Sequence, residues 1–314
     1  MFKNTKKLFF PLIILLVLSL TASCGTSDRN TNKDGKLSVI TTVFPLYDFA
    51  LQIGGNKVDA EMLLTPGAEV HGFEPTASDM LKVNKADLFI YIGGESEKWV
   101  DSVIRSTASG SYKALKTIDR VALHHQEHSH EDGEEHTTDE HIWTSLTNAS
   151  LIAEAIAKAF VEVDEENAEF YRANLEKLTS DIKALDNEYR EMINQAKTKT
   201  LVFAERFPFI YLAEDYGLTY YAAFDGCSHD SEPTLKRTAF LIDMIKKNSL
   251  NSVFVIEYSD RSIAEAIREA TSAEILMLHS CHNVSTDELK SGVSYCSLMR
   301  NNLTVLKKAL GVNQ

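Results

Sequence analysis

The chain has 314 residues, of which 44% are hydrophobic and 25% are charged, and its formal net charge at pH 7 is −13. This acidity disfavours nucleic acids and anionic membrane surfaces as ligands, because both would be repelled, and it suits a protein that captures cations. The length is sufficient for two lobes, each with a hydrophobic core of its own.

The first residues have the pattern of a secretory signal. Residues 1–7 contain three lysines and no acidic residue. They precede the apolar run Leu8–Leu20, which is too short to span a membrane as a helix. Small residues follow the run as far as Cys24. We therefore expect residues 1–23 to be a signal peptide and the rest of the chain to be exported.

The end of this leader, residues 20–24, reads LTASC and resembles the bacterial lipobox, in which the cysteine is lipidated and becomes the first mature residue. The lipobox usually has Leu three residues before the cysteine, where this chain has Thr21. The resemblance implies a lipid on Cys24 that anchors the protein to the outer face of the cytoplasmic membrane. Residues 24–36 are then a linker, since from Gly25 on they are all Gly, Thr, Ser, Asn, Asp, Lys or Arg.

From Leu37 onward, short β-branched runs alternate with helical patterns. The predicted strands are 37–43, 58–64 and 87–92. The predicted helices between them are 46–53 and one that begins near Thr76 or Ser78. Strands that alternate with helices are typical of βαβ units and a mostly parallel sheet. Residues 37–164 are therefore predicted to form an N-terminal α/β lobe.

Histidines and carboxylates crowd the segment 124–136, which reads HHQEHSHEDGEEH and holds five of the ten histidines in the chain. Such a composition cannot bury apolar surface, so it predicts a solvated loop. Neutral imidazole is a common ligand for zinc and other transition metals, which makes this loop a candidate auxiliary metal site. A charged insertion that binds metal only incidentally remains the alternative. The five side chains are those of His124, His125, His128, His130 and His136.

Residues 148–197 contain no Gly or Pro, and their apolar residues recur at helical spacing. A break at Val163-Asp164 divides this stretch into a first helix and a long second helix over 165–197. At 1.5 Å per residue the second helix would be about 50 Å long. We interpret it as a rigid helix that links two lobes.

The alternation of strands and helices resumes after the long helix. The predicted elements are strands at 200–203, 218–224, 252–257 and 274–278 and a terminal helix over 295–310, which Gly311 ends. Residues 198–314 are thus predicted to form a C-terminal lobe. The fold class is α/β, with two lobes that each contain a mostly parallel sheet flanked by helices and one long rigid helix between them.

Three histidines outside the acidic loop lie where the predicted elements begin or end. His71 lies in the loop after the second strand, His141 just before the helix near 148, and His279 directly after the last strand, with His282 three residues later. Ligands of open α/β sheets bind beyond the carboxyl ends of the strands. This shared placement indicates a metal site.

The chain resembles, across nearly its whole mature length, the zinc/manganese class of ABC-transporter solute-binding lipoproteins. The matching segments are FPLY at 44–47, HGFEPTASD at 71–79, EHIW at 140–143, YLA at 211–213, EP at 232–233 and VFVIE at 253–257. The resemblance implies the two-lobed, helix-linked fold and metal-binding roles for His71 and His141. It also implies zinc, because the acidic insertion occupies the place it has in zinc-specific members.

Two positions depart from the pattern of that family. The third ligand is usually a histidine five residues before Tyr211, where this chain has Arg206, which cannot coordinate a cation, although Glu205 beside it can. The fourth ligand, usually a carboxylate, aligns with His279. The resemblance therefore implies His71, His141, His279 and Glu205 or water as the ligands. Three imidazoles favour Zn²⁺ over Mn²⁺, which prefers oxygen.

Several further residues are expected near this site. After Cys24 only three cysteines remain, and an oxidising compartment favours one disulfide, for which Cys227 and Cys281 are preferred, with thiolate ligation of the metal as the alternative. Glu257, at the end of its strand, is expected to orient a ligand histidine. Arg206 and His282 are expected to surround the ligands rather than to bind the metal.

These features predict an exported, monomeric binding lipoprotein that captures Zn²⁺ in a cleft between the lobes and delivers it to an ABC permease. A manganese-binding member of the same family and a surface adhesin are the alternatives. A secreted zinc hydrolase is disfavoured, because the HxxEH pattern at His124–His128 lies in a polar low-complexity segment and that motif requires a helix. We expect no enzyme and no nucleic-acid partner.

Overall fold

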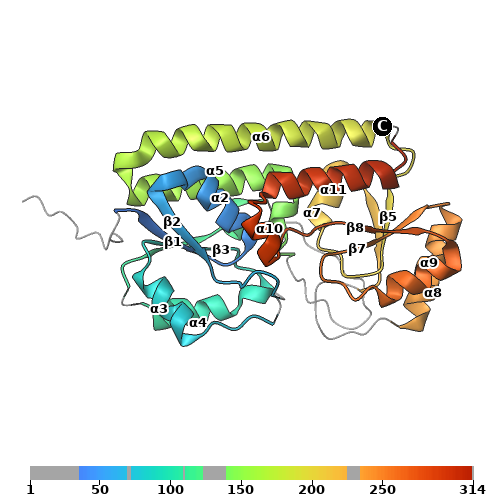
Figure 1. The fold of residues 1–314 in the computed structure, drawn as a ribbon, viewed down its shortest axis with the longest axis horizontal. Helices are drawn as coiled ribbons and strands as arrows, with labels where there is room; N and C mark the ends of the chain where they lie inside the picture. The colour runs from blue at the N-terminus through green and yellow to red at the C-terminus, as the bar shows by residue number, and fades with distance from the viewer. Residues whose placement is uncertain (1–34, 69–71, 109, 123–138, 225–233, 313–314) are drawn as a thin grey trace, which may run out of the picture. The chain divides into compact units, whose positions relative to one another are not determined.

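The computed structural model describes residues 35–68, 72–108, 110–122, 139–224 and 234–312 (Figure 1). The predicted signal peptide, the lipidated Cys24, the His-rich loop, the predicted ligand His71 and the predicted disulfide partner Cys227 lie outside the described residues. In the part of the chain that is described, no helix has both the length and the apolar character needed to cross a membrane.

The N-terminal lobe is built on a four-stranded parallel sheet with the strand order β2-β1-β3-β4. Its strands are β1 (Leu37–Thr41), β2 (Val58–Met62), β3 (Leu88–Tyr91) and β4 (Lys113–Lys116). Edge strand β4 was missed by the sequence prediction. Its sequence, KALK, contains no β-branched or aromatic residue and therefore lacks the usual signal for a strand.

Helices cover both faces of this sheet. The helices are α2 (Phe44–Gly54), α3 (Ala77–Lys85), α4 (Trp99–Ser106) and α5 (Leu146–Val163). Because side chains alternate along a strand, Val39 packs on the face covered by α2 and α5, whereas Ile40 packs on the face covered by α3 and α4. Helix α3 begins at a capping box in which Thr76 and Asp79 exchange hydrogen bonds.

The C-terminal lobe repeats this plan with a second parallel sheet of order β6-β5-β7-β8. Its strands are β5 (Thr200–Phe203), β6 (Thr219–Ala222), β7 (Ser252–Val255) and β8 (Glu274–Met277). The helices that follow them are α7 (Ile210–Tyr216), α8 (Leu235–Lys247), α9 (Ser262–Thr271) and α10 (Thr286–Lys290), and the chain then enters α11 (Tyr295–Ala309). Helices α8 and α9 cover one face of the sheet (Figure 1).

The predicted long helix is present as α6 (Ala168–Gln195), preceded by a short 3₁₀ turn. Its 28 residues correspond to about 42 Å of helix. Helix α11 runs alongside α6 and also packs against α2 (Figure 1). The main-chain N–H of Tyr295, in the first turn of α11, donates to Asp48 Oδ2 of α2 at 2.9 Å, and the far end of α11 accepts from Lys197. The lobes are therefore linked by two helices.

The structure corrects the expectation that each lobe has a separate core. One continuous apolar cluster contains Phe49 of α2, Leu185 and Tyr189 of α6, and Phe203 and Phe254 of the C-terminal sheet. Helices α6 and α11 contribute to this cluster together with both sheets, so the cores of the two lobes are continuous there. Two smaller apolar clusters each belong to a single lobe. One includes residues of α3 and α4, and the other includes residues of α8 and α9.

Candidate metal site

Two histidines from distant parts of the chain face each other in the described structure. His141 precedes the 3₁₀ turn Ile142–Thr144 in the N-terminal lobe, and His282 lies in the loop after β8 of the C-terminal lobe. Their ring centroids are 5.2 Å apart with an interplanar angle of 85°. Both are buried, with 2% and 7% of their surface exposed, and the Trp143 ring packs against each of them.

Asp139 holds the His141 ring in one orientation. Its Oδ1 accepts from the main-chain N–H of His141 at 2.8 Å and lies 3.1 Å from Nδ1 of the same residue. A carboxylate beside Nδ1 keeps the proton on that nitrogen, so that Nε2 carries the lone pair available to a cation. Asp139 was not among the predicted site residues. Its position two residues before a candidate ligand was the only sequence signal for this role.

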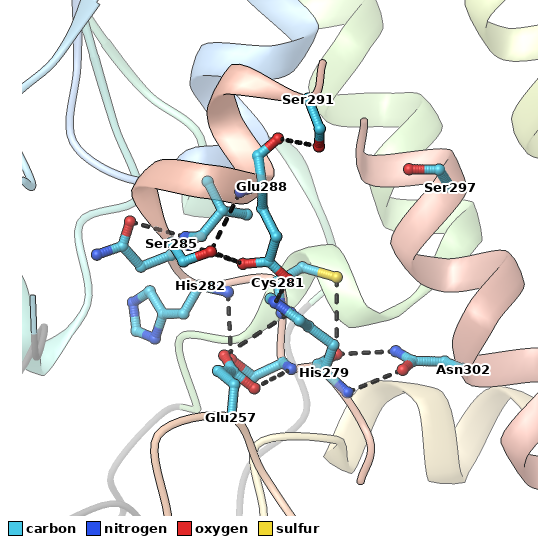
Figure 2. Close-up of polar contacts among 12 residues, drawn as sticks. Glu257, His279, Cys281, His282, Ser285, Glu288, Ser291, Ser297 and Asn302 are labelled. Atoms are coloured by element: carbon cyan, nitrogen blue, oxygen red, sulfur yellow. Dashed lines mark hydrogen bonds and ion pairs between the residues drawn. The ribbon is translucent and has the colours of Figure 1, made fainter. Parts of the chain in front are cut away.

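The loop that carries His282 is shaped by side chains that bind its main chain (Figure 2). Ser280 donates from its N–H to Glu257 Oε2 at 2.7 Å and from its hydroxyl to Glu257 Oε1. The Ser280 hydroxyl in turn accepts from the N–H of His282 at 3.2 Å. Glu257, two residues after β7, therefore holds the main chain of His282 in place through Ser280.

The other end of this loop is tied to α11. The side chain of Asn302 accepts from the N–H of His279 and donates to the carbonyl of His279, both at 2.8 Å. Asn302 is buried, and sequence reasoning missed it. Its signal would have been an amide side chain on the apolar face of the terminal helix, where a buried polar group needs a partner.

The same loop is also bonded to the N-terminal lobe. The carbonyl of His282 accepts from the N–H of Phe44 at 3.1 Å, and the carbonyl of Ser280 accepts from the indole N–H of Trp143 at 2.8 Å. The side chain of Asn283 donates to the carbonyls of Thr65 and Ala68, in the segment that leads to His71. His282 is therefore held by both lobes.

His279, the predicted fourth ligand, has a different environment. Its Nδ1 accepts from the N–H of Cys281 at 2.9 Å, whereas its Nε2 is buried without a hydrogen-bond partner among the described residues and lies 3.7 Å from Glu288 Oε1. The bond from Cys281 therefore engages one ring nitrogen and leaves the other without an acceptor or donor at hydrogen-bond distance in the described part of the chain. His282, whose ring faces His141, is therefore a candidate ligand alongside His279, the ligand expected from the sequence.

Glu205 and Arg206, at the end of β5, make other contacts. Glu205 Oε1 accepts from the Ser259 hydroxyl, and the Arg206 guanidinium lies 5.9 Å from the centroid of the Phe224 ring. Among the described residues, no group of three or more His, Cys, Asp and Glu side chains is arranged to hold a metal ion. His141 and His282 are the two candidate ligands whose rings are shown in contact in the described part of the chain.

Cys227, the predicted disulfide partner of Cys281, lies outside the described residues, and Cys281 is a free thiol in the structure. Its backbone is left-handed, with φ of 62°, and its sulfur and the His282 ring point to opposite sides of the loop (Figure 2). Burial raises the pKa of the Cys281 thiol well above its ordinary value. Burial away from positive charge thus favours the protonated form of this thiol in the metal-free chain.

Glu140, which directly precedes His141, and Glu97 are both buried carboxylates. Glu97 Oε2 accepts from the N–H of Gly93 at 2.7 Å, and Glu140 Oε2 accepts from the N–H of Ser96 at 2.9 Å. Burial raises the pKa of Glu97 to about 7, and the charge of Glu140 adds to the rise. Glu140 places a carboxylate beside the candidate ligand in the sequence, which favours cations there.

Replacing Glu97 with Gln is expected to stabilise the fold above neutral pH. Because the pKa of Glu97 is higher in the folded chain, its contribution to stability is greatest below about pH 4.5 and is lost as pH rises through 7. Glu97→Gln keeps an acceptor for Gly93 and removes this penalty, which amounts to about 3 kcal/mol at pH 8. Thermal unfolding of both proteins at pH 5 and pH 8 measures the effect. An equal difference at the two pH values would contradict it.

Two α/β lobes linked by long helices, with histidines from both lobes facing each other, define the class of two-lobed, metal-binding solute-binding proteins. The family model described as the zinc-uptake complex component A, periplasmic (ZnuA), matches residues 39–309. The chain belongs to this family, which confirms the resemblance noted in the sequence. The members named here are zinc-binding and zinc-uptake proteins, not enzymes.

Individual relatives agree with this assignment. The zinc-binding lipoprotein AdcA of Streptococcus pneumoniae is 31% identical over 304 residues, which cover 94% of this chain but 60% of AdcA. The high-affinity zinc uptake system protein ZnuA of Bacillus subtilis is 30% identical over 320 residues, 99% of each chain. This chain therefore spans about three fifths of AdcA and nearly all of the Bacillus protein.

Solved structures confirm the predicted fold. The metal-dependent lipoprotein YcdH of Bacillus subtilis matches with a TM-score of 0.77 and 29% identity, over 88% of this chain and 100% of YcdH. Zn(II)-bound AdcA of Streptococcus pneumoniae matches with a TM-score of 0.75 and 29% identity, over 88% of this chain and 58% of AdcA. The laminin-binding adhesin Lmb of Streptococcus agalactiae, in a mutant structure, gives 0.78 at 25% identity, over 87% of this chain and 99% of Lmb.

Proposed function

We propose that this chain is the substrate-binding lipoprotein of an ABC importer, and that it captures Zn²⁺ outside the cell and delivers it to a membrane permease. The observation that carries the proposal is the buried pair His141 and His282, in which Asp139 contacts the His141 ring and Glu257 holds the main chain of His282 through Ser280. Membership in a zinc-uptake family and the zinc-binding relatives support the choice of metal.

The ligand set follows from the arrangement of the loops. We assign His71, His141 and His282 as ligands, with the fourth position taken by Glu205 or water. Three imidazoles with one oxygen suit tetrahedral Zn²⁺ better than Mn²⁺. His71 is included because it follows Ala68 by three residues, and the carbonyl of Ala68 is bonded to Asn283 beside His282. His279 then supports the loop and does not bind the metal.

The remaining parts of the proposal concern location and supply. A lipid on Cys24 would keep a monomeric protein at the outer face of the cytoplasmic membrane, close to its permease. The histidines of residues 124–136 would collect zinc as an auxiliary site, because they offer several exchangeable ligands without a fixed geometry.

Equilibrium metal binding tests the proposal. The mature chain, with and without residues 124–136, is titrated with Zn²⁺ and with Mn²⁺ in competition with a chelator. We expect one tight Zn²⁺ site that survives the deletion, the loss of weaker sites with the loop, and a lower affinity for Mn²⁺. Loss of all tight binding on deletion, or a preference for Mn²⁺, would contradict the proposal.

A further inference from the structure

A side chain of the C-terminal lobe holds the residue that orients His141. The hydroxyl of Tyr211, in the first turn of α7, donates to the main-chain carbonyl of Asp139 at 2.8 Å. Tyr211 is fully buried, and α7 packs against the 3₁₀ turn that follows His141. Asp139 is thus held at two points, by Tyr211 at its carbonyl and by His141 at its carboxylate.

From this arrangement we infer that Tyr211 is a positioning residue for the zinc ligand His141 and acts across the lobes through Asp139. The inference rests on the proposed function, because it takes His141 to be a ligand. A bond to the carbonyl of Asp139 fixes the plane of the peptide between Asp139 and Glu140. The orientation of that peptide sets the direction of the Asp139 side chain, and the carboxylate in turn sets the tautomer and the orientation of the imidazole.

The consequence is that zinc affinity depends on the contact between the lobes. If α7 moves away from the turn that follows His141, Asp139 loses one of its two anchors and the imidazole becomes free to reorient. The position of His282 also depends on the contact between the lobes, because its loop accepts hydrogen bonds from Trp143 and Phe44 of the other lobe. A partner that moved the lobes apart by a small distance would therefore weaken zinc binding without contacting a ligand.

Removing only the hydroxyl of Tyr211 tests this role. Loss of a group that orients a metal ligand typically lowers metal affinity 10- to 100-fold. Tyr211 contacts Asp139 rather than the ligand His141 itself, so we expect the smaller effect, a roughly tenfold loss of Zn²⁺ affinity in Tyr211→Phe. Tyr189→Phe is the matched control. The Tyr189 hydroxyl is also buried and also donates to a main-chain carbonyl, that of Met299 at 2.7 Å, so its loss should lower the melting temperature but leave zinc affinity unchanged.

A double-mutant cycle separates positioning from general stability. If Tyr211 acts through Asp139, Tyr211→Phe should change zinc affinity less than about twofold once Asp139→Ala is present, because coupled residues are not additive. Asp139→Asn, which keeps an acceptor for His141, serves as the second background if Asp139→Ala does not fold, and there the tenfold effect of Tyr211→Phe should persist.

The outcomes distinguish this inference from the proposed function. Unchanged affinity in Tyr211→Phe, or the same tenfold loss with Asp139→Ala as without it, would overturn the role of Tyr211 and leave the proposed function standing. If His141→Ala binds Zn²⁺ as tightly as the unmodified chain, the ligand assignment itself fails, and the inference fails with it.

Discussion

Replacing His282 with alanine is expected to weaken Zn²⁺ binding on the order of a hundredfold, whereas replacing His279 should weaken it tenfold or less. Four-ligand zinc sites bind with about 10–16 kcal/mol, so one ligand contributes on the order of 3 kcal/mol, or a factor of about a hundred. The His279 ring already uses Nδ1 to accept from Cys281, so its removal disturbs only the loop. Competition titrations against a zinc chelator measure both variants.

Thermal unfolding of the zinc-free variants provides the control. His282→Ala should unfold near the temperature of the unmodified chain, because the main-chain bonds to Ser280 and Phe44 remain. His279→Ala should be the less stable of the two, since it loses the bond to the N–H of Cys281 and leaves a buried gap. The assignment of ligands would be wrong if His279→Ala were the variant that lost zinc.

Truncating Leu185 to alanine is expected to destabilise the whole chain by about 3 kcal/mol and to lower the unfolding temperature of both lobes together. Leu185 is fully buried in the middle of α6, within the apolar cluster that includes residues of both sheets. A buried Leu→Ala change costs about 2–5 kcal/mol, because it removes apolar contacts and leaves a cavity. Calorimetry and hydrogen exchange report the size of the loss and its extent.

Leu241→Ala is the matched comparison for that experiment. Leu241 is also fully buried, but it is a residue of α8 and packs in the smaller apolar cluster that belongs to the C-terminal lobe alone. We expect a similar loss of stability, with increased exchange in the C-terminal lobe before the rest of the chain. Two separate unfolding transitions in Leu185→Ala, with one lobe unaffected, would contradict the continuous core.

The alternation of apolar runs with helical patterns was sufficient to predict the two-lobed fold, because each run is long enough to mark a buried strand. It did not indicate β4, whose edge position requires little apolar character. It also did not indicate that α11 runs beside α6 and continues the core between the lobes. Periodicity identifies which face of a helix is apolar but not which other elements that face meets.

The sequence located the loops of the candidate site but not the orientation of the side chains within them. Motifs located the loop His279–Val284, but spacing along an irregular loop does not determine which ring turns toward His141. That choice depends on the left-handed backbone at Cys281 and on the bonds that Glu257 and Asn302 make to the main chain. The roles of Asp139 and Tyr211 likewise could not be predicted from the sequence, because they arise from a contact between residues that are 72 positions apart.

We propose that His141 and His282 hold the same zinc ion, and anomalous scattering at the zinc edge from crystals of the zinc-loaded mature chain tests this most directly. We predict a peak about 2.0–2.1 Å from Nε2 of His141 and from a ring nitrogen of His282. The His279 ring should still accept its hydrogen bond from the N–H of Cys281. A peak bound by His279 and not by His282, or zinc confined to residues 124–136, would contradict it.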